Sequence, residues 1–124
     1  MRLAERIKNM TGEQALLCYQ CGLCSGACPV RKHMDISPTQ LIRFVQTDNL
    51  DKIFKTNTYW ICSSCYACQL VCPKEIKITK IIEALRQTKL RMEQDKISIS
   101  ALSKEELERL PPIALVGNFR KTTA

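Results

Sequence analysis

Eight cysteines are the residues of this sequence whose type and spacing could do chemistry. They form two sets, and each set has the spacing C-x2-C-x2-C-x3-C and is followed directly by proline. The sets are Cys18, Cys21, Cys24 and Cys28, and Cys62, Cys65, Cys68 and Cys72. Runs with this spacing hold [4Fe–4S] clusters in bacterial ferredoxins. Two complete copies in 124 residues predict two [4Fe–4S] clusters.

The spacing also predicts how the cysteines divide between the clusters. Three thiolates within a short stretch can reach three irons of one cubane when the backbone curls around it, whereas the fourth lies past the curl and ligates the other cluster. The proline after the fourth cysteine favours an extended backbone, which lets the chain leave the cluster. We therefore expect one cluster on Cys18, Cys21, Cys24 and Cys72, and the other on Cys62, Cys65, Cys68 and Cys28.

Small residues between the cysteines fit such a curl. Gly22 and Gly26 permit positive φ and a close approach of the backbone. The apolar residues Leu23, Leu70 and Val71 have two open interpretations. They could shield the clusters from water, or they could belong to an ordinary core.

Zinc and disulfides are the alternatives to iron–sulfur clusters. Structural zinc sites use two C-x2-C pairs with a longer spacer, whereas three cysteines here crowd into each C-x2-C-x2-C run. The single histidine, His33, lies outside the pattern, and we expect it to be a surface residue without a role. Disulfides would suit a secreted chain, in which eight cysteines could form a scaffold of bridges.

Nothing in the sequence indicates export or a membrane span. No apolar run approaches the ~18 residues that a transmembrane helix needs, and residues 1–8 lack the apolar core of a signal peptide. We therefore expect a cytoplasmic protein. In that compartment clustered cysteines bind metals or do redox chemistry more often than they form bridges.

The formal net charge of +7 suggests an acidic partner, an anionic membrane, nucleic acid or only a solvated basic surface. The basic residues are spread along the chain with few aromatic residues among them, which disfavours nucleic acid. A [4Fe–4S]²⁺ core on four thiolates carries about −2, so two clusters would bring the charge to about +3. The remaining charge would suit an acidic partner surface.

Helical patterns surround both cysteine motifs. Residues 37–40 (SPTQ) predict a helix start, with serine as the cap and proline at the first helical position. Apolar residues at helical spacing continue this helix, and a second short one is expected at 50–54. A further helix follows Pro73, with one apolar face made of Ile78, Ile81, Ile82, Leu85 and Met92.

An N-terminal helix is marked by Leu3, Ile7 and Met10 and should end near Gly12. No segment of residues 1–95 reads convincingly as a strand. The sequence therefore predicts an all-α domain over these residues, with short helices around two clusters. Such a small domain buries little apolar area, so the clusters should stabilise it by cross-linking its segments. The metal-free form should therefore be largely disordered.

The C-terminal extension, residues 96–124, has a different pattern. Residues 97–100 (ISIS) could form a short alternating strand, and residues 103–106 (SKEE) form a capping box that starts a short helix. Pro111 and Pro112 should stop this helix. The isolated apolar run at 113–117 either folds back on its own domain or docks on another protein, and we favour docking on a partner subunit.

These motifs resemble a known family. The two C-x2-C-x2-C-x3-C-P runs with a helical insert look like the α-helical ferredoxin domain. Residues 18–24 (CYQCGLC), 27–29 (ACP) and 60–68 (WICSSCYAC) are similar to the two motifs of the C-type iron–sulfur subunits of heterodisulfide reductases. The similarity covers about residues 1–92.

The resemblance implies an electron-transfer subunit that relays electrons through two [4Fe–4S] clusters. Its partners would be the flavin-containing A-type and the catalytic B-type subunits of a methanogenic or sulfur-metabolising complex. The chain has one histidine and no evident acid–base pair, so we expect no catalytic residues and no bond chemistry of its own. The alternatives are a free ferredoxin-like carrier and an iron–sulfur subunit of a fumarate reductase-like or glycolate oxidase-like flavin dehydrogenase.

Overall fold

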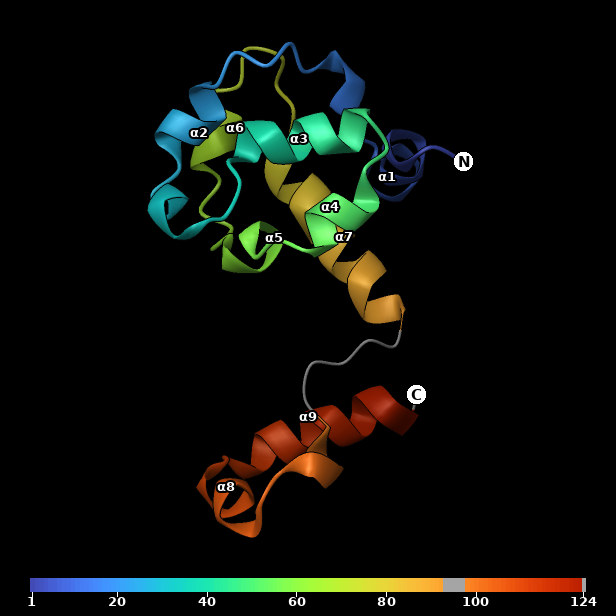
Figure 1. Ribbon diagram of the computed structural model, residues 1–124, viewed down its shortest axis with the longest axis vertical. Coiled ribbons are helices and arrows are strands. Elements are labelled where there is room, and N and C mark those ends of the chain that lie inside the picture. The colour runs from blue at the N-terminus through green and yellow to red at the C-terminus, as the bar shows by residue number, and fades with distance from the viewer. Residues whose placement is uncertain (93–97, 124) are drawn as a thin grey trace. The chain divides into compact units, whose positions relative to one another are not determined.

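The computed structural model describes residues 1–92 and 98–123, and every regular element in these ranges is a helix. This confirms the predicted all-α fold. The chain forms two compact units, Met1–Met92 and Glu93–Ala124 (Figure 1). The domain boundary expected between residues 95 and 96 lies outside the described residues.

The first unit holds both cysteine motifs in a series of short helices. In chain order the elements are α1 (Leu3–Thr11), η1 (Ala15–Leu17), α2 (Leu23–Ala27), η2 (Arg31–His33), α3 (Pro38–Gln46), α4 (Leu50–Phe54), α5 (Thr58–Ile61), α6 (Ala67–Leu70) and α7 (Ile78–Arg91). Each C-x2-C-x2-C run therefore ends in a short helix, α2 or α6, and each motif is followed by a longer one, α3 or α7.

The ends of α1 show why it is limited to residues 3–11. The side chain of Asp48 accepts a hydrogen bond from the backbone N–H of Leu3 at 2.7 Å, which satisfies one of the free donors at the start of the helix. Gly12 closes the helix as predicted, with φ of +77° and its N–H donating to the carbonyl of Lys8. Met10 lies at the edge of the apolar face and is exposed.

Helix α3 begins with the predicted capping box. The Ser37 hydroxyl accepts from the N–H of Gln40, and the Gln40 side chain accepts in return from the N–H of Ser37. Pro38 occupies the first turn, where no N–H is needed. The following helix α4 was also predicted, and Ile53 is its buried residue.

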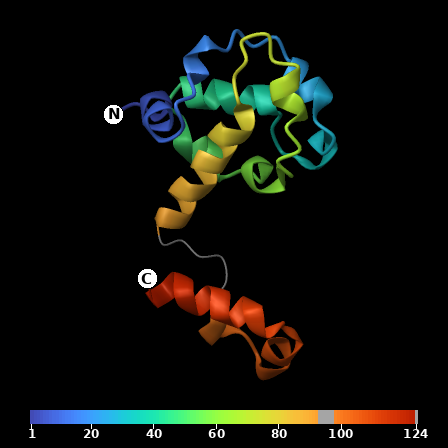
Figure 2. The same cartoon turned by 180° about the vertical axis from the view of Figure 1, so that it is seen from behind.

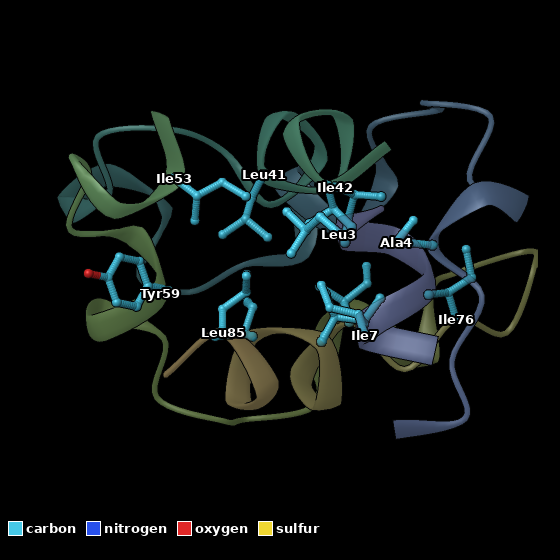
Figure 3. Packing of buried hydrophobic residues seen from close by; sticks show 14 of the residues in the cluster. Leu3, Ala4, Ile7, Leu41, Ile42, Ile53, Tyr59, Ile76 and Leu85 are labelled. Carbon is cyan, nitrogen blue, oxygen red and sulfur yellow. The ribbon is translucent and has the colours of Figure 1, made fainter. Parts of the chain in front are cut away.

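The core of the unit lies where α1, α3 and α7 meet (Figure 3). Leu41 and Ile81 are completely buried, as are equivalent residues one turn later in each helix, Val45 and Leu85. Most of the expected apolar face of α7 is therefore confirmed. Met92 is the exception, because α7 ends at Arg91 and the Met92 side chain, which follows it, is exposed.

Helix α5 was not predicted from the sequence. It is a single turn, Thr58–Ile61, and it buries Tyr59 against the core. The buried Thr58 hydroxyl donates to the carbonyl of Ile36 at 2.8 Å and accepts from the N–H of Ile36 at 3.1 Å. These bonds fix the segment before the second motif against the segment that leads from the first motif to α3.

The second unit consists, in its described part, of η3 (Ile99–Ala101), α8 (Lys104–Arg109) and α9 (Pro112–Thr123). The possible strand at 97–100 is wrong for residues 99 and 100, which lie in η3, and Ile97 lies outside the described residues. Helix α8 has the predicted capping box on Ser103.

The apolar run after Pro112 is part of helix α9, because proline at a first helical position starts a helix as readily as it stops one. Among residues 1–92 and 98–123, no helix is both long and apolar enough to cross a bilayer.

Candidate metal centres

The cysteines of the first unit line two cavities, each of which draws on both motifs. The first site is the cavity lined by Cys18, Cys21, Cys24 and Cys72, together with Gly22, Thr39, Ile42, Ile76 and Ile78. The space between its lining atoms, opening included, is about 310 Å³. Three of its cysteines come from one motif and the fourth from the other.

The second site mirrors this arrangement. It is lined by Cys28, Cys62, Cys65 and Cys68, together with Val30, Met34, Pro38, Ser63, Tyr66, Thr79 and Ile82, around about 340 Å³ of space. The structure thus brings together the same two sets of four cysteines that the spacing predicts. Binding of a cluster by these sets stays a prediction.

The curls between the cysteines depend on left-handed backbone at matching positions. Gly22 has φ of +82°, and Tyr66, 44 residues later, has φ of +64°. Gln20 and Ser64 form a second such pair, with φ of +64° and +55°. Glycine at position 22 was the signal in the sequence, whereas nothing marked Tyr66. These turns place α2 beside α6 (Figures 1 and 2).

A threonine near the start of the helix after each motif contacts a cysteine of the same site. The Thr39 hydroxyl lies 3.3 Å from the Sγ of Cys24, and the Thr79 hydroxyl lies 3.8 Å from the Sγ of Cys68. Both threonines are the second residue of their helix. Neither was predicted, although a shared T-x-x-I pattern at 39–42 and 79–82 was available as a signal.

A polar side chain from each of these helices also holds the backbone before the motif. Gln46 donates to the carbonyls of Ala15 at 3.0 Å and Cys18 at 2.8 Å. Arg86 does the same in the second half: its Nε donates to the carbonyl of Tyr59 at 2.5 Å, and its guanidinium donates to the carbonyl of Cys62. Nothing in the sequence marked either residue.

The two halves are therefore related by a repeat, and we call residues 15–46 the first half and residues 59–86 the second half. Ala15 and Cys18 correspond to Tyr59 and Cys62, since each pair is separated by 44 positions. Gln46 and Arg86 are both the ninth residue of the helix after their motif. The repeat extends from the cysteines to the side chains that support them.

The cysteines of each half differ in exposure, and the two halves agree at the second cysteine of the motif but not at the third. Cys21 and Cys65, the middle ones, are exposed, whereas Cys24 is buried. Burial raises the pKa of the Cys18 and Cys68 thiols. These thiols therefore hold their protons at neutral pH, and binding of iron to them would release protons.

The apolar residues next to the cysteines do not behave as either interpretation proposed. Leu23, Leu70 and Val71 are exposed, and Leu70 is 84% exposed. They are not core residues, and none of the three lines either cysteine cavity. Tyr19 is also exposed, and the Lys74 ammonium lies 5.7 Å from the centre of its ring. His33 is exposed, as expected.

The residues present fit a [4Fe–4S] cluster in each cavity. Each offers four thiols, a hydroxyl beside one sulfur, and otherwise mostly apolar side chains. Within the described residues, no group of three or more His, Cys, Asp or Glu is arranged to hold a single metal ion. The four thiols of each site instead surround a space, as ligands of four different irons must do.

Comparison with known proteins identifies a family. Residues 14–76 match the model of the 4Fe-4S dicluster domain. The C subunit of the H₂:CoB-CoM heterodisulfide, ferredoxin reductase of Methanothermobacter marburgensis is 35% identical over 83 residues, which are 67% of this chain and 45% of the relative. The second of the C-type iron–sulfur subunits of CoB–CoM heterodisulfide reductase from Methanocaldococcus jannaschii is 39% identical over 69 residues, 56% of this chain and 37% of the relative.

A third relative is the C subunit of the ferredoxin:CoB-CoM heterodisulfide reductase of Methanosarcina mazei. It is 31% identical over 86 residues, which are 69% of this chain and 53% of the relative. The chain thus spans about half or less of the length of these curated relatives. The dicluster match and the eight cysteines together support two [4Fe–4S] clusters as the cofactors.

Proposed function

Because this chain belongs to the 4Fe-4S dicluster domain family and has an electron-transfer role, we propose that it relays electrons between two larger redox subunits. The partners we propose are a flavin-containing subunit and a catalytic subunit of a heterodisulfide reductase-like complex. The three relatives carry that reductase in their names. The chain's own part would be to hold two clusters close together and to catalyse no bond change.

When bound, [4Fe–4S] clusters supply sites that accept and give up one electron at a time. The residues of the chain prepare these sites. The cysteines would hold the iron, and Cys28 and Cys72 would tie each site to the other motif. The hydroxyls of Thr39 and Thr79 can donate to thiolate sulfur, which stabilises the added negative charge of a reduced site.

The observation that carries this proposal is the crossing of the fourth cysteines between the motifs. Cys72 lies in the cavity of the first motif and Cys28 in that of the second, and the helices α2 and α6 of the two motifs pack against each other. Two one-electron sites are thereby held in one rigid arrangement. Such a pair suits a relay, because electrons can pass from one site to its neighbour without movement of the protein.

The exposed Cys21 and Cys65 suggest where electrons leave and arrive. Each is the exposed cysteine of its site, and exposed residues with large apolar side chains lie close by in the sequence, such as Leu23 and Tyr66. We propose that one partner covers the first site and another covers the second. The basic balance of the chain would favour acidic surfaces on those partners.

We further propose that the C-terminal extension, residues 96–124, docks on a partner subunit. Helix α9 presents Ile113 and Val116, three positions apart, and Ile113 is 74% exposed. An apolar helix face of this kind suits a groove on another protein. The cytoplasm remains the compartment that we propose, since free clustered cysteines suit a reducing environment.

Metal analysis tests the cofactor part of the proposal. Protein purified without oxygen should contain about eight iron and eight sulfide per chain, and the reduced protein should give the EPR spectrum of two coupled clusters. Two zinc ions without sulfide would overturn it.

Truncation tests the partner-binding part. The chain without residues 111–124 should keep its iron and its reducibility but no longer co-purify with the larger subunits from its native extract. If the chain with residues 111–124 retained is a monomer without partners in that extract, it is a free ferredoxin-like carrier instead. Co-purifying subunits of a different flavin dehydrogenase would assign it to that class of enzyme.

A further inference from the structure

We propose that Arg86 is a positioning residue that gives the second site a higher reduction potential than the first. The inference rests on the proposed cluster binding, and it adds which of the two sites retains an electron. It starts from the repeat, because Gln46 and Arg86 occupy equivalent positions but only one of them carries a charge.

The contacts of Arg86 place its charge at the backbone of a predicted ligand. Its guanidinium donates to the carbonyls of Tyr59, at 2.5 Å, and Trp60, at 3.3 Å, and also to the carbonyl of Cys62. The first two carbonyls lie in the single turn of α5. A positive charge near the C-terminal end of a helix stabilises the helix. In the first half, the carbonyls equivalent to those of Tyr59 and Cys62 accept from the neutral amide of Gln46 instead.

A fixed positive charge favours the reduced form of a neighbouring site, because reduction adds one negative charge there. The Arg86 side chain is only 17% exposed, so solvent and salt screen it less than they screen a surface charge. Its ion partner Glu83, at 3.4 Å, is 51% exposed and therefore compensates it only in part.

A second pair of equivalent residues acts in the same direction. The backbone N–H groups of Arg31 and Glu75 each donate to the carbonyl of the fourth cysteine of their motif, three residues earlier. Arg31 is half-buried, and its guanidinium donates to the carbonyl of Met34, which lines the second site. Glu75 is exposed beside the oppositely charged Lys74 and has little net effect on the first site.

Two contacts at the first site oppose this difference. The Thr39 hydroxyl lies closer to the Sγ of Cys24, at 3.3 Å, than the Thr79 hydroxyl lies to the Sγ of Cys68, at 3.8 Å. The amide of Gln20 donates to the Sγ of Cys18 at 3.4 Å and stabilises charge on the first site. A hydrogen bond from a neutral amide or hydroxyl is weaker than the influence of a guanidinium. An electron given to the first site by a flavin-containing donor would therefore move to the second site. The first site is then reoxidised by one electron and the second site is reduced by one.

The test is a redox titration of the loaded protein, followed by EPR. Arg86→Gln gives the second half the residue of the first, and it should lower the potential of one cluster so that its reduction equilibrium falls about tenfold, which is about 59 mV for one electron. The potential of the other cluster should stay unchanged. Arg86→Lys keeps the charge and should restore most of the difference.

Two further variants keep the test decisive if Arg86→Gln does not fold. Gln46→Arg should raise the potential of the first site, and Glu83→Gln, a change at an exposed side chain, should raise that of the second. Cys72→Ala and Cys28→Ala, each measured alone, assign the signals to the sites.

Equal potentials in the unchanged protein, or equal shifts of both clusters in Arg86→Gln, would refute the role of Arg86. Absence of iron and sulfide from the unchanged protein would instead refute the proposed function.

Discussion

The first half of the cluster unit, residues 15–46, and the second half, residues 59–86, perform one structural task with partly different side chains. A threonine hydroxyl contacts a cysteine sulfur at the equivalent position of both halves, and in the first half the amide of Gln20 also contacts the Sγ of Cys18. Where a side chain contacts backbone carbonyls the halves differ, with glutamine in one and arginine in the other. The threonine contact to sulfur is thus the same in both halves, whereas the side chain that binds the backbone carbonyls differs in charge and keeps its hydrogen bonds.

Removal of iron should unfold both halves together, and this is the largest effect that we expect. Without clusters, Cys28 and Cys72 no longer tie each site to the other motif, and the small core must hold the helices alone. A chelator under reducing, oxygen-free conditions should abolish most of the helical circular dichroism of residues 1–92. Retention of a cooperative thermal transition with native ellipticity would contradict this.

Removal of one crossed cysteine should separate the halves. Cys72→Ala should cost the first site its cluster and Cys28→Ala the second, so each variant should retain about four of about eight irons. The cluster that remains should differ between the two variants in its EPR spectrum. If Cys28→Ala instead lost the cluster of its own motif, the fourth cysteines would not cross.

Truncation of equivalent core residues should destabilise both halves alike. Leu41 and Ile81 are both completely buried, and each is the fourth residue of the helix after its motif. Leu41→Ala and Ile81→Ala should each lower the free energy of unfolding of the loaded protein by about 2–5 kcal/mol. The exposed Leu70 provides the control, since Leu70→Ala should stay within about 0.5 kcal/mol. A large difference between the two core variants would show that one half carries the stability.

The threonines should have a smaller, unequal effect on the clusters. Thr39→Val removes a hydroxyl 3.3 Å from the Sγ of Cys24, and Thr79→Val removes one 3.8 Å from the Sγ of Cys68. Both changes should lower the potential of their own site, and the change at Thr39 should lower it more, because its hydrogen bond is shorter. Redox titration measures both, and a larger shift for Thr79→Val would contradict the geometry.

The smallest expected effect is at Gln69. Its Oε1 is buried and has no hydrogen-bond partner within the described residues, whereas the equivalent Ser25 lies 2.6 Å from the Thr39 hydroxyl. Gln69→Ser should allow the same bond to Thr79 and change the free energy of unfolding by about 1 kcal/mol or less. Chemical denaturation measures this. A loss of several kcal/mol in the free energy of unfolding would show that packing of the Gln69 side chain contributes to stability despite its unpaired oxygen.

The cysteines and the helix starts were readable from the sequence because their rules are local. The spacing of the motifs predicted which cysteines share a cavity, and the cap at Ser37 marked the start of α3. Residues such as Arg86 and Tyr66 were not readable. Arg86 reaches a backbone 24 positions away, and Tyr66 adopts a left-handed backbone that the surrounding turn imposes on a residue that rarely takes it.

The helical patterns in the sequence did not predict α5 or the start of α9, and each failure has a physical reason. Helix α5 is one turn long, too short for a periodic signal, and it forms because Tyr59 is buried and Arg86 binds its carbonyls. Pro111 and Pro112 predicted only the end of a helix, whereas Pro112 also begins the next one, α9.

The exposure of Cys21 and Cys65 has a consequence for the lifetime of the protein in air. The surface through which an electron reaches a site is also the surface through which dioxygen or peroxide can reach iron and thiolate sulfur. A chain with both edges uncovered is therefore open to oxidative damage at two points. A partner seated over either cysteine would protect it, so the assembled form should outlast the isolated chain whenever oxidants are present.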